Sequence, residues 1–157
     1  MATANDRTRS ADEHQGSGTE GRIPRIISSG AVPMEYEELT GRIIGCAYNV
    51  YNRMGFGFTE SVYERCLCLE IAKAGLTFET QKPIKVFYDG HLVGDFVADI
   101  LVEDTVIVEL KSLTRLLPAH EVQLVNYLVA TGKPVGLLLN FGENGVQVKR
   151  KVRVLIH

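Results

Sequence analysis

The stretch Val97–Lys111, V-A-D-I-L-V-E-D-T-V-I-V-E-L-K, sets acidic residues and a lysine within otherwise apolar segments. Because a buried charge is costly, such residues are expected to pair with each other or to bind a metal. Glu109 and Lys111 are two apart and therefore point to one face of a strand. Asp99 lies on the preceding predicted strand and can sit beside Glu109 across a hairpin. The stretch therefore predicts one spot where two carboxylates and an ammonium group converge.

The turn between these two strands decides whether the carboxylates meet. A two-residue turn at Glu103 and Asp104 would pair Asp99 with Val108 and leave Glu109 on the opposite face of the sheet. A loop of odd length, or a bulge, would place Asp99 opposite Glu109. A shared site requires the second arrangement.

The composition is that of a soluble globular domain. The chain has 157 residues, of which 45% are hydrophobic and 23% charged, with a formal net charge of -2, so a single domain of ordinary size is expected. Residues 1–33 are polar and aperiodic, and they predict a disordered leader without a secretory signal before a domain at 34–157. No apolar run is long enough to span a membrane. The charge gives no general attraction to nucleic acid, so such binding would need a local patch.

The three cysteines, Cys46, Cys66 and Cys68, fall in helical patterns rather than at the spacings of a zinc site. Cys66 and Cys68 are two apart on a helix, so their side chains diverge. The pattern favours reduced thiols in the core of a cytoplasmic protein.

Helices and strands follow one another in a simple order. Residues 34–54 and 60–74 show apolar side chains at helical spacing, separated by Gly-Phe-Gly-Phe at 55–58. The later segments are strands, except for a helix at 118–130, and they lie at 83–88, 92–102, 105–110, 135–141 and 146–156. The order ααβββαββ predicts an α/β fold with a central mixed sheet flanked by helices.

Polar residues on these elements are candidates for function. Glu60 lies on the same stripe as the apolar residues of its helix, although an acid in the first helical turn can also simply face water. His120, Gln123 and Tyr127 form one polar stripe on the third helix, a pattern that is more often a solvated face or a helix–sheet contact. The last strand alternates valines with the cations Lys149, Lys151 and Arg153. This pattern predicts a strand with one solvent-exposed face. The minority interpretation is a strip that contacts phosphates.

The central residues suit a particular chemistry. Carboxylates that bind a hard divalent ion help to generate a nucleophilic hydroxide and to polarise a phosphoryl oxygen, as phosphodiester hydrolysis requires. A lysine beside them can hold the attacking water and offset developing charge. Asp99, Glu109 and Lys111 therefore suit metal-assisted phosphodiester cleavage. A structural ion pair of Glu109 with Lys111, with Asp99 at a bulge, is an alternative that these residues leave open.

Three motifs carry a resemblance to a known family. Asp99 followed by Glu109-Leu110-Lys111, after a helix and a strand hairpin and before another helix, resembles the PD-(D/E)XK nuclease superfamily. Gln123-Leu124-Val125-Asn126-Tyr127 is similar to the Gln-x-x-x-Tyr motif of its RecB-like branch. Gly57-Phe58-Thr59-Glu60-Ser61-Val62-Tyr63 resembles the signature of the bacterial GxxExxY proteins, a family placed in that superfamily. The resemblance covers about residues 35–153.

This resemblance implies a metal-dependent nuclease that uses Mg²⁺ or Mn²⁺, with DNA expected as the substrate in preference to RNA. It implies catalytic Lys111 and three metal ligands, to which the Leu110 carbonyl can be added: Asp99, Glu109 and Glu60. The supporting residues near the site would be Gln123, Tyr127 and His120. The expected partner is nucleic acid, and no association with a membrane is expected. A homodimer is compatible with this interpretation. The alternative is a noncatalytic nuclease-fold module that binds nucleic acid or a protein partner.

Overall fold

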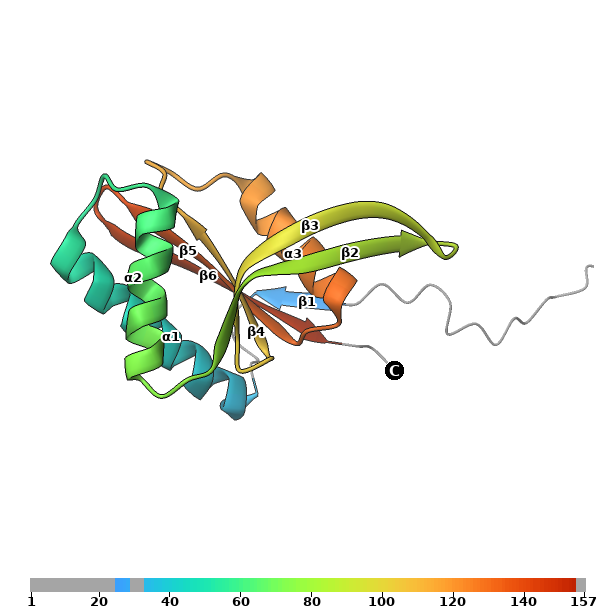
Figure 1. The fold of residues 1–157 in the computed structure, drawn as a ribbon, viewed down its shortest axis with the longest axis horizontal. Helices are drawn as coiled ribbons and strands as arrows, with labels where there is room; N and C mark the ends of the chain where they lie inside the picture. Colours follow the sequence, from blue (N-terminus) through green and yellow to red (C-terminus); the bar gives the residue numbers. More distant parts are fainter. Residues whose placement is uncertain (1–24, 29–32, 155–157) are drawn as a thin grey trace, which may run out of the picture.

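A twisted six-stranded sheet forms the centre of the computed structural model, which describes residues 25–28 and 33–154 (Figure 1). In chain order the elements are β1 (Arg25–Ser28), α1 (Met34–Met54), α2 (Glu60–Lys73), β2 (Phe78–Tyr88), β3 (His91–Val102), β4 (Val106–Lys111), α3 (Pro118–Thr131), β5 (Val135–Gly142) and β6 (Gly145–Val154). From residue 34 onward this is the predicted order, and the α/β fold is confirmed. Among the described helices, none is long and apolar enough to cross a membrane.

The strands lie in the order β1-β6-β5-β4-β3-β2. β4 and β5 run parallel, because α3 connects them as a crossover, while the other neighbours are antiparallel. β1 lies within residues 1–33, where the sequence predicts a disordered leader, and it pairs with β6. The rest of that leader, residues 1–24 and 29–32, and the predicted end of the last strand lie outside the described residues. The predicted strand begins at Pro83, whereas β2 begins at Phe78. The strand can include the proline because β2 lies at the edge of the sheet, where proline is tolerated.

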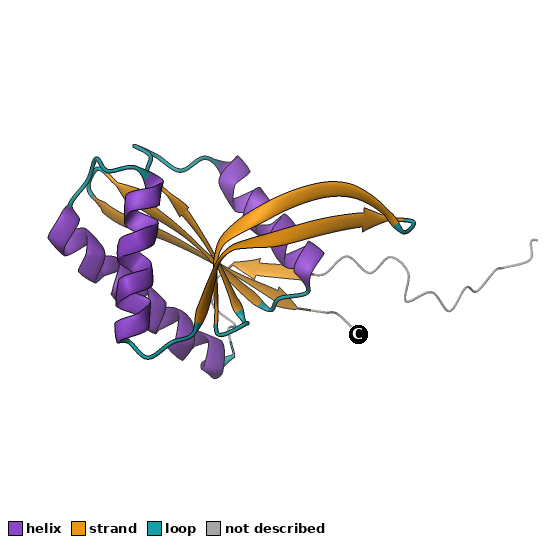
Figure 2. Ribbon diagram, in the orientation of Figure 1, coloured by secondary structure: helices purple, strands orange, loops and turns teal. Residues whose placement is uncertain are grey.

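Helices cover both faces of the sheet (Figure 2). On one face α1 and α2 pack on alternate residues of the central strands, among them Val108 and Leu110 of β4. On the other face α3 packs through Leu124 and Leu128 on a second set that includes Ile107. Since side chains alternate along a strand, Glu109 points to the α3 side.

The β2–β3 hairpin continues past the rest of the sheet as a two-stranded arm (Figure 1). Pairing between β3 and β4 stops at Ile100↔Val108, whereas β2 and β3 pair as far as Tyr88↔His91. Asp89 and Gly90 form the predicted tight turn at its tip, with positive φ angles of 49° and 75°. The two strands therefore diverge from β4 at the point where the candidate site begins.

Candidate active site

The turn between β3 and β4 sets the register that the site requires. Residues 103–105 separate the paired residues Val102 and Val106, so the loop has three residues. Its first two residues have positive φ angles of 51° and 50°. This odd length places Asp99 opposite Glu109 when the pairing is continued from Ile100↔Val108. The odd length therefore meets the register condition that a shared site requires.

Asp99 and Glu109 join the two strands where the backbone pairing ends. Glu109 Oε1 accepts a hydrogen bond from the Asp99 backbone N–H at 3.1 Å. Asp99 Oδ2 accepts one from the Leu110 backbone N–H at 2.8 Å. Each carboxylate thus binds the main chain of the opposite strand, and these reciprocal bonds hold the two side chains next to each other.

Both acids have raised pKa values. Burial raises the pKa of Glu109, which is only 6% exposed, and the charge of Asp99 raises it further, to about 8. Burial also raises the pKa of half-buried Asp99. The Lys111 ammonium lowers the pKa of both carboxyls, but it does not offset the other effects. The positive charge near the pair is therefore too small to balance two ionised carboxylates. None of the ion pairs among the described residues includes Glu109.

Tyr127 of α3 packs in the core on the α3 side of the sheet and is hydrogen-bonded to Gln123. Gln123 Nε2 donates a hydrogen bond to Tyr127 Oη at 3.0 Å. Burial raises the pKa of Tyr127, and the charges of Glu109 and Asp99 raise it further. His120 Nδ1 accepts a hydrogen bond from the Leu117 N–H at 3.0 Å at the start of α3, and its supporting role stays a prediction.

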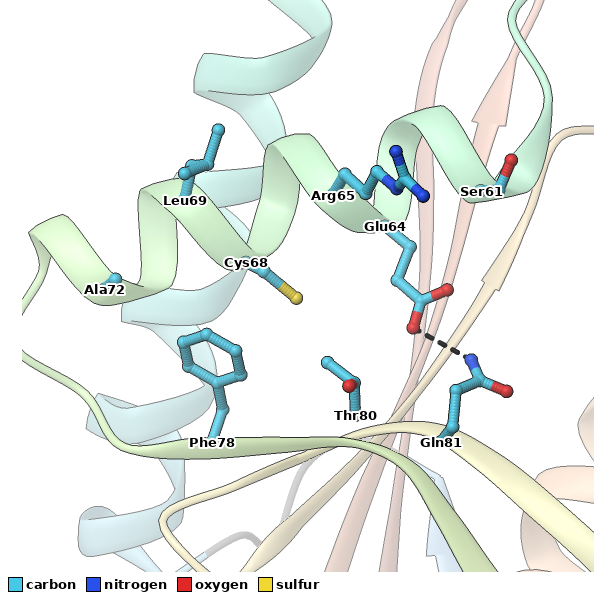
Figure 3. Close-up of a pocket in the computed structure, with 9 residues that line it drawn as sticks. All are labelled: Ser61, Glu64, Arg65, Cys68, Leu69, Ala72, Phe78, Thr80 and Gln81. Atoms are coloured by element: carbon cyan, nitrogen blue, oxygen red, sulfur yellow. Dashed lines mark hydrogen bonds between the residues drawn. The ribbon is translucent and has the colours of Figure 1, made fainter.

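Two acids of α2 influence the site from another side. Glu60, the expected third ligand, is exposed at the first position of the helix. Glu64 is half-buried, and it accepts a hydrogen bond from Gln81 Nε2 at 2.9 Å across the cavity of about 730 Å³ between α2 and β2 (Figure 3). Its charge raises the pKa of Asp99 more than the charge of Glu60 does. The sequence analysis missed Glu64, although its place one turn after Glu60 could have suggested it.

Gln81 is the second residue that the sequence analysis missed. Thr80 pairs with Ile100 and Lys82 with Ala98, so Gln81 stands opposite Asp99 in the register, but the pairing skips this position. Its φ of 51° lies in the left-handed region, which is uncommon for glutamine. Strained backbone of this kind often occurs at functional sites.

The segment that resembles the GxxExxY signature has a structural role. Tyr63 is fully buried and stacks on Phe141, with ring centroids 4.3 Å apart. Its hydroxyl donates to the Gly55 carbonyl and accepts the Phe58 N–H, so it holds the loop before α2. Gly57 has a φ of 114°, which an L-residue rarely adopts. The glycine and the tyrosine therefore fix the start of the helix that carries Glu60 and Glu64.

The loop that follows Lys111 is also anchored. Buried Asn140 accepts the Leu113 N–H at 2.8 Å and donates to the Leu113 carbonyl at 2.9 Å. Ser112 Oγ donates to the Phe58 carbonyl at 2.6 Å. These bonds tie the end of β4 to β5 and to the loop before α2, so Lys111 extends from a fixed support.

Two of the three cations of the predicted phosphate strip contact the protein itself. Lys151 forms an ion pair with Glu121 of α3 at 3.0 Å. Arg153 donates to the Gly132 carbonyl at 2.7 Å. Lys149 is exposed. The strip therefore lies against α3, and its role toward nucleic acid stays a prediction.

The donor set fits a hard divalent cation. Two adjacent carboxylates with raised pKa values offer the oxygen ligands that Mg²⁺ and Mn²⁺ prefer. In the described part of the chain, no three His, Cys, Asp or Glu side chains are grouped closely enough to hold one ion. Asp99 and Glu109 are brought together, and Glu60 as a third ligand stays a prediction.

Comparison with known proteins agrees with this fold. A model of the PD-(D/E)XK nuclease superfamily matches residues 37–153, most of the chain. The chain therefore belongs to the PD-(D/E)XK nuclease superfamily. No curated protein and no solved structure matches it.

Proposed function

We propose that the protein is a metal-dependent nuclease that hydrolyses phosphodiester bonds, prefers DNA to RNA and uses Mg²⁺ or Mn²⁺. The observation that carries the proposal is the reciprocal hydrogen bonding that holds the Asp99 and Glu109 carboxyls together. Lys111 is two residues from Glu109 on the same strand, and its charge acts on both carboxyls. Membership of the nuclease superfamily supports the type of reaction.

The residues divide the work between binding and proton handling. Asp99 and Glu109 would hold the cation, with the Leu110 carbonyl as a further oxygen ligand. When bound, such a cation acidifies a water molecule and polarises a phosphoryl oxygen. Lys111 Nζ orients the attacking water and offsets the negative charge that develops on the phosphate. The Gln123–Tyr127 hydrogen bond fixes the phenol, and both residues would support the site.

The proposal includes two finer assignments. The protein would belong to the GxxExxY family, because residues 57–63 match its signature and Gly57 and Tyr63 have defined structural roles. It would act in the cytoplasm, which the cysteine pattern favours.

A cleavage assay tests the proposal. The purified protein is incubated with Mn²⁺ and with DNA and RNA of varied structure. Asp99→Asn keeps an oxygen for the Leu110 N–H but removes the charge, and it should reduce cleavage by about a hundredfold or more, as should Lys111→Met. Asp95→Asn is the matched control, because Asp95 is exposed on the same strand. Cleavage that survives both changes at the site would refute the proposal.

A noncatalytic nuclease-fold module is the second candidate. The net charge of -2 and the internal contacts of Lys151 and Arg153 favour a protein partner for such a module over nucleic acid. Calorimetric titration with Mn²⁺ separates the two candidates. Binding that disappears in Glu109→Gln supports the enzyme, whereas a wild-type protein that binds no Mn²⁺ supports the module.

A further inference from the structure

The cavity between α2 and β2 combines apolar walls with a polar end (Figure 3). Its volume of about 730 Å³ is within the size range of ligand pockets. The apolar walls are formed by Cys68, Leu69, Ala72 and Phe78, and the polar end by Ser61, Glu64, Arg65, Thr80 and Gln81. The lining therefore suits a ligand that is apolar on its faces and polar at one edge.

Gln81 reaches the cavity through strained backbone. Thr80 and Gln81 are neighbours on β2, and neighbouring side chains of a strand normally point to opposite faces. Both nevertheless line the cavity, and Gln81 has the φ of 51° described above. This conformation is unfavourable for a residue with a Cβ, and burial does not offset the strain because Gln81 is exposed. The strain therefore indicates a functional constraint on the Gln81 side chain.

The polar end of the cavity offers hydrogen-bonding groups to a ligand. Gln81 Nε2 donates a hydrogen bond to Glu64 Oε1 at 2.9 Å, and the amide has a second N–H and a carbonyl oxygen beside it. None of the ion pairs among the described residues includes Arg65. A glutamine amide can pair with the edge of a nucleobase, and a guanidinium group can bind a phosphate. The polar end therefore has the groups that recognise a nucleotide.

This polar end adjoins the candidate site. Gln81 stands opposite Asp99 in the register of β2 and β3, between two paired positions. Neighbouring strands of a sheet are about 5 Å apart. The cavity therefore begins one strand away from a carboxylate to which the proposed function assigns the cation. A nucleic-acid strand with one phosphate at that cation would bring a neighbouring base to the mouth of the cavity.

We propose that the cavity binds one unpaired nucleotide of the nucleic-acid substrate, with the base between the apolar walls, its edge at Gln81 and a phosphate at Arg65. This inference rests on the proposed function, which supplies the nucleic acid. Bases bind to apolar and aromatic side chains through their faces, largely irrespective of sequence. A base within a duplex is paired and stacked, so it enters such a cavity only from a single-stranded or opened region. The cavity thus selects unpaired strands as the substrate class.

Fluorescence anisotropy with labelled oligonucleotides, in low salt and with a chelator, measures binding without cleavage. The full-length protein should bind a single strand at least about fivefold more tightly than a duplex or an abasic strand of equal length, which has the same phosphates. Gln81→Gly should remove most of the difference between the base-bearing and the abasic strand. Asp89→Gly is the matched control, because Asp89 has a φ of 49° at the tip of the arm. It should change neither affinity.

A second variant and a stability measurement keep the test independent of misfolding. Thr80→Phe narrows the cavity from β2, where Thr80 is exposed, and should weaken binding of the base-bearing strand but not of the abasic strand. The melting temperature should not fall in either glycine variant, because glycine adopts a positive φ without strain. A fall in Gln81→Gly alone would assign Gln81 a structural role and overturn its role at the base.

The remaining outcomes separate this inference from the nuclease proposal. Equal affinity of the wild-type protein for base-bearing and abasic strands overturns the inference, as do equal effects of the changes at positions 81 and 89. Tighter binding of a free deoxynucleoside monophosphate than of the strand overturns it too. Base-dependent binding without cleavage in Mn²⁺ supports the cavity and refutes the nuclease, whereas cleavage without base dependence does the reverse.

Discussion

At the scale of single residues, the surroundings of Glu109 make the metal-free protein sensitive to pH. Its pKa rises from 4.5 to about 8 on folding, so the protonated acid is the form that folding favours. This contribution to the free energy of unfolding is fully present below pH 4.5 and is lost as the pH rises through 8. Binding of a divalent cation would oppose the loss, because the cation binds the charged form.

We therefore expect the melting temperature in the presence of a chelator to fall by about 3 °C or more between pH 6 and pH 9. Glu109→Gln should remove most of this fall, because the amide does not ionise. Thermal denaturation followed by circular dichroism at several pH values provides the measurement. An equally steep fall in the variant would assign the effect to other groups.

The two acids of α2 are expected to contribute unequally to metal binding. The charge of Glu64 acts more strongly on Asp99 than that of Glu60 does, and Gln81 holds the Glu64 carboxylate. Glu64→Gln should weaken Mn²⁺ binding by about threefold to tenfold, as loss of one nearby charge does at intermediate dielectric. Glu60→Gln should have a smaller effect in the same calorimetric titration. A larger loss in Glu60→Gln would instead support Glu60 as the ligand that the family resemblance implies.

At the scale of elements, Tyr63 links α2 to the loop before it and to β5. Tyr63→Phe removes the hydroxyl between the Gly55 carbonyl and the Phe58 N–H, and it should cost about 1–2 kcal/mol in the free energy of unfolding. Tyr48→Phe is the control, because Tyr48 is 47% exposed on α1. Urea denaturation measures both variants, and a similar cost in the two would contradict the structural role of the Tyr63 hydroxyl.

The elements also show how far sequence reasoning extends. Spacing within the chain was enough to order the helices and strands and to mark Asp99, Glu109 and Lys111 as candidates, whose roles stay predictions. It could not decide whether the acids meet, because that depends on the conformation of residues 103–105. It also missed Gln81, whose contact with Glu64 depends on a positive φ angle that nothing in the neighbouring residues indicates.

At the scale of the whole molecule, β1 is the strand at one edge of the sheet and belongs to the predicted leader. A protein shortened to residues 34–157 should still fold, because both cores are formed by residues between 43 and 152. It should melt about 3 °C lower or more, since the backbone pairs between β1 and β6 are lost. Calorimetric melting of the two proteins tests this, and failure of the shortened protein to fold would extend the domain toward the N-terminus.

In the sheet, too, some features follow from the residues of a single strand and others depend on several strands. Residues 105–110 are apolar on both faces, as is typical of a central strand, and β4 lies between β3 and β5. The arm was not foreseen, because its residues alternate like those of any hairpin. The arm projects from the sheet because β3 stops pairing with β4 while it continues to pair with β2. That end point depends on three strands and cannot be inferred from one of them.

The three residues that connect Val102 to Val106 carry a consequence for how this chain can change in length. Removing or adding a single amino acid there would turn one strand over relative to its neighbour, and Asp99 and Glu109 would part to opposite sides while the sheet stayed paired. A gain or loss of two amino acids would keep them together. The proposed chemistry therefore depends on whether the number of residues between Val102 and Val106 is odd or even, and replacing side chains one by one would never expose that dependence.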